Sequence, residues 1–280
     1  MNTGDVSSRL EYERIAYLLN PEELSSKLVT AVGLGSGGAP VCDHLSMNGV
    51  RRWHLYDPDI LELTNLVKHP RMRHDIGRPK VDIQRDWLLD RNPSSEVAIF
   101  QEDVMKAEYF DKSIQASDLV LVCPDSKAVR EFVSDKCVAF HKPFVVASVF
   151  RTGIGGEIFG YQPNETGCYR CLQLYSLLSG SDLTDDELGL TPEEENRIYG
   201  LNDREFRASG LSIDIQMISL IQARMALSYL LRSGSSKLPS MKANWVIFGN
   251  RPAPNIFRQH FQVTQILLKP QAECNCTQNG

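Results

Sequence analysis

The sequence predicts an α/β fold: a doubly wound, largely parallel sheet that C-terminal antiparallel strands extend. Short apolar runs alternate with helix-length segments from residue 28 to about residue 148, which is typical of a parallel sheet. A glycine-rich turn follows the first run. The alternation ends after Gly156, and two late strands, 245–248 and 261–268, are expected to be antiparallel.

The first elements follow from apolar runs and the residues that bound them. Residues 28–32 are apolar and precede glycines, which predicts a buried strand. The helix expected at 39–48 has Pro40 in its first turn and Gly49 just past its end, positions that favour these residues. The second strand is expected at 53–56.

The later elements repeat this pattern. An amphipathic helix is expected at 80–91, ended by Asn92 and Pro93. Further strands are expected at 97–100, 119–123, 144–148 and 158–161, and further helices at 126–140 and 213–231.

The chain divides into a polar N-terminal segment, 1–27, which is expected to be helical, and one domain, 28–280. An acidic, polar stretch at about 179–210 interrupts this domain. So long a segment inside a compact domain is usually functional or disordered.

Composition and charge are those of an ordinary soluble globular protein: 280 residues, 42% hydrophobic and 23% charged. The net charge of -5 argues against a nucleic-acid partner, and no run reaches the roughly 18 apolar residues of a membrane span. We see no signal peptide, so the seven cysteines, an odd number, indicate a reducing cytoplasm. Closely spaced cysteines are then expected to bind metal.

Gly33, Gly35 and Gly38 fit the G-x-G-x-x-G pattern of a Rossmann-like nucleotide site. The first glycine makes a tight turn, the second lets phosphate approach the backbone, and the third lets the helix pack on the strand. Asp57, 24 residues after Gly33, stands where an acid binds ribose. Alone, the motif favours a nicotinamide or flavin enzyme, and a turn that binds nothing is the plain alternative.

Three charged residues favour a triphosphate instead. Lys80 begins an expected helix, Lys68 lies on the preceding loop, and Asp125 directly follows a strand, where ligands bind in open α/β sheets. Lysines would balance phosphate charge, and a carboxylate would hold Mg²⁺. Each residue also has a simpler explanation, because a lysine at a helix start is usually solvated and Asp125 would serve as the N-cap of helix 126–140. The prediction of a triphosphate site therefore depends on the three residues together, in this order along the chain.

The order of these motifs resembles the ThiF/MoeB/ubiquitin-activating-enzyme superfamily over about residues 9–235. The motifs that carry the resemblance are GxGxxG, DPDILELTNL, DIGRPK, NP, PDSKAVR and GCYRC. The resemblance implies that 28–280 is an adenylation domain using ATP and Mg²⁺. Its reaction would be adenylation of the C-terminal Gly of a ubiquitin-like or sulfur-carrier protein, with release of pyrophosphate.

The resemblance also implies roles for individual residues. The three glycines would hold the phosphate region, and Asp57 would bind ribose. Asp59 and Asn65 would assist at the nucleotide, Lys80 would contact the phosphates, and Asp125 would position Mg²⁺ at the α-phosphate.

Two features bear on the subunit arrangement and on activity. Arg14, in LEYERI, aligns with a family segment whose arginine reaches the partner subunit's ATP, which implies a homodimer; a solvated arginine is the alternative. The family's NLxRQ is here Asn65-Leu-Val-Lys68-His69. Lysine keeps the charge but lacks the bidentate fork of arginine. A catalytically weak subunit of a heterodimer therefore stays open. The glycine loop alone also leaves a nicotinamide-dependent oxidoreductase open, although Lys80 and Asp125 have no task in such an enzyme.

The cysteines suggest a structural metal. Cys168 and Cys171 have zinc spacing, and Cys274 with Cys276 would complete a set of four ligands, a zinc knuckle formed by 168–171 with 274–276. Free thiols and a disordered tail are the alternative. The other cysteines, 42, 123 and 137, are expected to be structural.

Residues 172–210 contain no cysteine. Thioester-forming relatives carry a reactive one in this region, so the resemblance predicts an enzyme that passes its activated carrier to a separate acceptor. This acceptor would be a sulfur donor or a conjugating enzyme. The acidic part of the segment, 181–195, would either cover the carrier's tail or remain a solvated loop.

Overall fold

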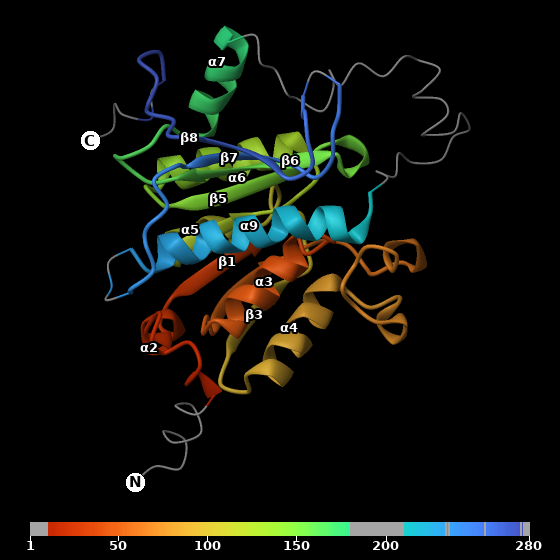
Figure 1. The fold of residues 1–280 in the computed structure, drawn as a ribbon. Helices are drawn as coiled ribbons and strands as arrows, with labels where there is room; N and C mark the ends of the chain where they lie inside the picture. Colours follow the sequence, from red (N-terminus) through yellow and green to blue (C-terminus); the bar gives the residue numbers. More distant parts are fainter. Residues whose placement is uncertain are drawn as a thin grey trace.

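The computed structural model describes residues 11–179, 210–232, 234, 236–254, 256–274 and 276. The strands in these residues are β1 (Leu28–Val32), β2 (Arg52–Tyr56), β3 (Glu96–Phe100), β4 (Leu119–Val122), β5 (Phe144–Val149), β6 (Gly155–Tyr161), β7 (Trp245–Gly249) and β8 (Gln262–Ile266). They form one eight-stranded sheet in the order β3-β2-β1-β4-β5-β6-β7-β8 (Figure 1). β1 to β5 pair in parallel, and β6, β7 and β8 are antiparallel to their neighbours, which confirms the predicted fold class.

Helices cover both faces of the sheet (Figure 1). One face carries α3 (Gly38–Met47), α4 (Lys80–Arg91) and α9 (Ser212–Leu230). The other face carries α5 (Phe110–Ala116), α6 (Lys127–Ala139) and α7 (Tyr169–Ser179). The short helices are α2 (Pro21–Ser25), η1 (Leu63–Asn65), η2 (Arg73–Asp75) and η3 (Arg151–Gly153).

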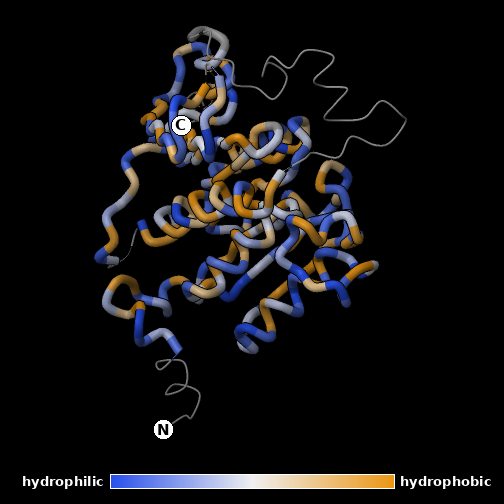
Figure 2. Tube along the Cα trace, turned by 45° about the vertical axis from the view of Figure 1, so that its right-hand side comes forward, coloured by the Kyte–Doolittle hydropathy of each residue, from blue (hydrophilic) through white to orange (hydrophobic). Residues whose placement is uncertain are grey.

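Two hydrophobic cores result, one on each face. On β1, Val29 and Ala31 belong to the core under α3 and α9, whereas Val32 belongs to the opposite core. Because helices cover both faces, every residue of β1 and of β4 is buried. Hydrophobic positions gather in the central layers of the molecule (Figure 2). None of the described helices is long and apolar enough to span a membrane.

Three regions differ from the expectations or lie beyond them. In the described part of the N-terminal segment, 11–27, Glu11 is helical and is followed by turns, and α2 is capped by Asn20 and begins at Pro21. The sequence does not predict α7, which begins at Tyr169 within the GCYRC motif. Residues 180–209, which hold almost all of the acidic stretch and most of the cysteine-free region, lie outside the described residues.

Candidate nucleotide site and cysteine cluster

The carboxyl ends of three neighbouring parallel strands bring most of the predicted site residues to one edge of the sheet. The glycine turn follows β1, Asp57 follows β2, and Asp125 follows β4 by three residues. β1 lies between β2 and β4, so the glycine turn lies between the two acids. The order of strands reverses here, which is where open α/β sheets bind ligands.

The glycine turn is tight at both ends and open in the middle. Gly33 has a φ of 86°, and a Cβ there would lie 2.9 Å from the backbone carbon of Cys123. A Cβ at Gly38 would lie 2.0 Å from the Gly33 carbonyl oxygen. By contrast, a Cβ at Gly35 would meet nothing within 4 Å. The turn itself therefore requires the outer glycines, and the backbone at Gly35 is open to approach.

The same turn presents unpaired donors at the start of α3. In the described part of the chain, the backbone N–H groups of residues 35–38 have no hydrogen-bond acceptor, and no side chain caps the helix. Such groups, together with the helix dipole, attract anions. From the other side, the Ser219 hydroxyl on α9 donates to the Gly37 carbonyl oxygen at 2.9 Å.

Asp57 is buried and helps to shape the turn. Its carboxylate accepts the Leu34 N–H at 2.6 Å and the Asp59 N–H at 2.9 Å. Burial raises the pKa of Asp57, an effect that Lys80 and the two N–H groups oppose. Asp57 therefore supports the glycine turn whether or not it also binds a ribose.

Lys80 is held between two carboxylates at the start of α4. Its Nζ lies 2.7 Å from Asp59 Oδ2 and 3.8 Å from Asp57 Oδ1. Asn65 has a local structural role, since its side-chain oxygen accepts the Glu62 N–H at 3.0 Å at the start of η1. The structure therefore places Lys80 at the site as the sequence suggests, already paired with acids.

Asp125 is exposed on the loop between β4 and α6, and its carboxylate makes no hydrogen bond or ion pair to any described residue. Its interpretation as an N-cap is wrong, because Ser126 caps α6 and accepts the Val129 N–H at 3.4 Å. Arg130 orients this loop, a role the sequence does not reveal. Its guanidinium donates to the carbonyl oxygens of Pro124 at 3.2 Å and Asp125 at 2.9 Å.

The structure does not bring Arg14 to the site of its own chain. Arg14 is exposed in a turn that also contains the buried Tyr12. The Tyr12 hydroxyl accepts a hydrogen bond from Asn92 at 3.1 Å, and the Arg51 guanidinium lies over its ring. Asn92 follows α4 and Arg51 precedes β2, so this turn lies at the amino edge of the strands, opposite the glycine turn.

The loop between β2 and α4 carries two buried residues that sequence patterns did not single out as site residues. His69 Nε2 lies 2.9 Å from the carbonyl oxygen of Leu34 in the glycine turn. Arg71 makes a two-pronged contact with Asp43 on α3, at 2.7 and 2.9 Å, and joins it to α4 through Gln84. Lys68, on the same loop, is half-buried, and its backbone carbonyl oxygen accepts a hydrogen bond from the Ser212 hydroxyl at 3.5 Å.

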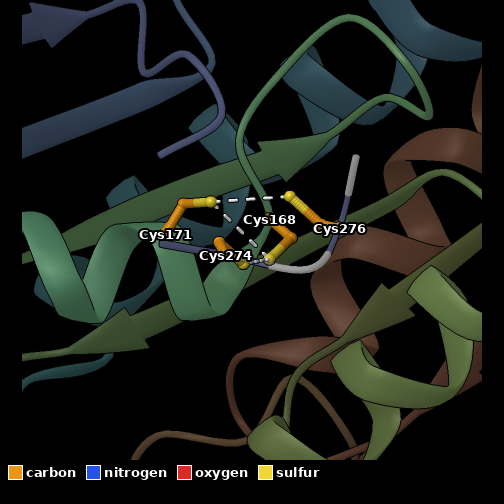
Figure 3. Close-up of side chains that lie close together, drawn as sticks. All are labelled: Cys168, Cys171, Cys274 and Cys276. Carbon is orange, nitrogen blue, oxygen red and sulfur yellow. Dashed lines mark hydrogen bonds between the residues drawn. The ribbon is translucent and has the colours of Figure 1, made fainter. Parts of the chain in front are cut away.

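A separate cluster joins the four predicted metal ligands at the antiparallel end of the sheet (Figure 3). The sulfurs of Cys168, Cys171, Cys274 and Cys276 all lie within 4.8 Å of one another. Cys168 lies 3.9 Å from Cys171 and 3.5 Å from Cys274, and Cys171 lies 3.6 Å from Cys276. Sulfurs around a tetrahedral zinc, at about 2.3 Å from the metal, are about 3.8 Å apart, so these residues fit such an ion.

Hydrogen bonds favour the thiolate form of Cys171 in this cluster. Cys168 donates to Cys171, and this bond, with the Gln271 N–H at 3.3 Å, lowers the pKa of Cys171 to about 5. The pKa of Cys168 is raised in turn. A metal ligand must be deprotonated, and the arrangement of donors favours that form at Cys171.

Comparison with known proteins agrees with this geometry. A family model described as ThiF family matches residues 13–275. The chain belongs to the ThiF family. This ThiF-family chain is 33% identical over 153 residues to the sulfur carrier protein ThiS adenylyltransferase of Escherichia coli K12, a match that covers 54% of this chain and 60% of that protein. It is 34% identical over 171 residues to the molybdopterin-synthase adenylyltransferase of the same bacterium, covering 60% and 67%.

Solved structures show the same fold. Escherichia coli MccB with ATP matches with a TM-score of 0.67 and 18% identity, covering 92% of this ThiF-family chain and 69% of that chain. Selenomethionyl PaaA matches with a TM-score of 0.69 and 14% identity, covering 96% and 84%. A third relative by sequence, ubiquitin-like modifier-activating enzyme 5 of Caenorhabditis elegans, is 24% identical over 192 residues, covering 65% of this chain and 46% of that protein.

Proposed function

We propose that this chain is an ATP-dependent adenylyltransferase that activates the C-terminal glycine carboxylate of a ubiquitin-like or sulfur-carrier protein. One observation carries the proposal: at one edge of a ThiF-family sheet, the glycine turn lies between Lys80 and the Asp125 carboxylate, and neither its N–H groups nor that carboxylate has a partner among the described residues. The names of its relatives point to the same reaction and carrier class. The chain spans 60% of the length of the ThiS adenylyltransferase that it matches.

The reaction joins two anions, so it depends on position and on charge compensation. A carboxylate oxygen of the carrier attacks the α-phosphorus of ATP, the new P–O bond forms, and the bond to the bridging oxygen breaks to release pyrophosphate. The N–H groups of residues 35–38 and Lys80 would bind phosphate oxygens, with Lys68 on the neighbouring loop. Asp59 lies beside Lys80 and would, together with Asn65, contact the nucleotide, and Asp57 would contact the ribose.

Mg²⁺ and Zn²⁺ would have different tasks. Asp125 would offer an exposed carboxylate oxygen to Mg²⁺, which would neutralise charge at the phosphates. The four cysteines would hold Zn²⁺ as a structural ion, because four protein ligands leave no open position. We place the reaction in the cytoplasm, where such thiols stay reduced.

The proposed unit is a homodimer in which Arg14 acts on the partner's ATP. Arg14 lies at the edge opposite its own glycine turn, so it would reach a nucleotide only in a second copy. Exposed apolar side chains beside the site offer a surface for that copy. They lie on the loop between β2 and α4 and at the start of α9: Ile60, Leu63, Val67, Met72, Leu211 and Ile213.

Complementation tests the dimer. Arg14→Ala and Asp125→Ala should each be inactive alone, but co-expressed chains should recover about a quarter of wild-type activity, because half of the dimers would hold one intact site. Activity no higher than that of either parent would contradict the shared site.

Carrier-dependent ATP–pyrophosphate exchange tests the reaction. The purified chain should exchange labelled pyrophosphate into ATP only when a ubiquitin-like protein ending in glycine is added. Tight NAD(H) binding without ATP binding would instead support the oxidoreductase. A separate acceptor, either a sulfur donor or a conjugating enzyme, would then release AMP from the activated carrier.

A further inference from the structure

Leu34, the residue between the first two glycines of the turn, is held at both of its backbone polar groups. Its N–H donates to the Asp57 carboxylate at 2.6 Å, and its carbonyl oxygen lies 2.9 Å from His69 Nε2. Asp57 follows β2, and His69 lies further along the loop that leads to α4. Two side chains from outside the turn therefore fix its conformation.

The contact with His69 sets the direction of the next N–H group. In a planar trans peptide the C=O and N–H bonds point in opposite directions. Because the Leu34 carbonyl points toward His69, the N–H of Gly35 points away from it. That N–H has no acceptor among the described residues, and the space beside Gly35 is open.

Packing alone does not explain a histidine at position 69, because one of its ring nitrogens is buried without a hydrogen-bond partner among the described residues. His69 is 6% exposed, and its Nδ1 has no hydrogen-bond partner in the part of the chain that the structure describes. A carbonyl oxygen only accepts, so Nε2 must carry the proton and Nδ1 is left as a bare buried acceptor. Such an atom lowers stability. An aliphatic side chain would remove this bare acceptor but would leave the Leu34 carbonyl oxygen without its donor, so the two costs nearly cancel. Burial lowers the pKa of His69 to about 4, which keeps the ring in this neutral form.

We propose that His69 is a positioning residue for the nucleotide: its Nε2–H fixes the Leu34 carbonyl and thereby directs the Gly35 N–H at phosphate. This inference rests on the proposed function, since it assumes that ATP binds at the glycine turn. It predicts that the hydrogen-bond donor at position 69 matters for ATP affinity more than the imidazole ring does.

Calorimetric titration of the full chain with ATP and Mg²⁺ tests this inference. His69→Leu removes both the donor and the bare acceptor, so it should weaken ATP binding about fivefold while the melting temperature stays close to that of the wild type. His69→Gln restores an N–H donor and should bind ATP within about twofold of the wild type. His69→Met gives the same comparison if His69→Leu does not fold.

His54 provides a matched control. It lies on β2 and is half-buried, its Nδ1 also lacks a partner among the described residues, and burial also lowers its pKa. Its ring, however, contacts Phe100 and Tyr109 rather than the turn. His54→Leu should therefore keep wild-type ATP affinity.

The outcomes separate the two claims. A wild-type chain that binds no ATP would contradict the proposed function. Wild-type binding that His69→Leu leaves unchanged, or that His69→Gln weakens as much as His69→Leu does, would contradict the role of His69 alone.

Discussion

The glycine-turn edge and the cysteine cluster lie in the two halves of one sheet and differ in how far the chain completes them. At the cluster, four sulfurs from segments about a hundred residues apart converge within 4.8 Å. At the glycine-turn edge, Asp57, Lys80 and His69 hold one another or the turn, while Asp125 and the N–H groups of residues 35–38 have no partner among the described residues. A structural site is closed by its own ligands, whereas a reacting site leaves selected groups for the substrate.

This difference predicts that Asp125 contributes to activity and not to stability. Asp125→Ala should reduce carrier-dependent ATP–pyrophosphate exchange about 10³-fold, because it removes the carboxylate that would hold Mg²⁺, with an unchanged melting temperature. Asp90→Ala, an exposed acid late in α4, is the control and should exchange like the wild type. Full activity of Asp125→Ala would contradict the proposed role of Asp125 in holding Mg²⁺.

The cluster should show the opposite behaviour. Cys171→Ser should abolish bound zinc, measured by atomic emission, and lower the free energy of unfolding by about 3 kcal/mol, because a structural ion contributes directly to folding. Cys137→Ala changes a buried cysteine outside the cluster and should keep the metal. Unchanged metal content in Cys171→Ser would show that the four sulfurs hold no ion.

Lys80 lies between these extremes, because it is both paired and predicted to bind phosphate. Lys80→Ala should lower kcat/KM for ATP about 10²-fold by removing a charge from the phosphate site. Lys136→Ala, which breaks a surface ion pair with Asp111, should leave it unchanged. A wild-type value for Lys80→Ala would confine this lysine to its contacts with Asp57 and Asp59.

The smallest effect concerns pH. Burial, with Arg71 and Lys80 nearby and opposed by Asp43 and the Leu34 carbonyl, lowers the pKa of His69 from 6.5 to about 4. The folded state prefers the neutral ring, so its contribution to stability is complete above pH 6.5 and is lost as the pH falls toward 4. Urea unfolding at pH 7 and pH 5 should show that the wild type loses about 2 kcal/mol more than His69→Gln. Equal losses would contradict a neutral, buried His69.

The sequence predicts most of the fold because its signals are local. The helix expected at 80–91 matches α4 residue for residue, since Pro79 precedes it and Asn92 ends it. β6 is longer than the expected 158–161, because Gly155 and Gly156 at its start do not show the sequence pattern of a strand. The structure requires glycine there, since a Cβ at Gly156 would lie 2.5 Å from the Ser148 carbonyl oxygen on β5.

The candidate site is predictable in position but not in its internal contacts. Topology places whatever follows β1, β2 and β4 at one edge, so the turn, Asp57 and Asp125 meet as the sequence suggests. The pairing of Lys80 with Asp59 and the burial of His69 depend on the path of the loop between β2 and α4. That path is set by tertiary contacts such as the Arg71 network, which no local pattern encodes.

A crystal structure with a non-hydrolysable ATP analogue and Mg²⁺ tests the central claim most directly. We expect the triphosphate on the N–H groups of residues 35–38, within reach of Lys80, and the metal on Asp125. A nucleotide bound elsewhere, or a triphosphate remote from both residues, would contradict this account.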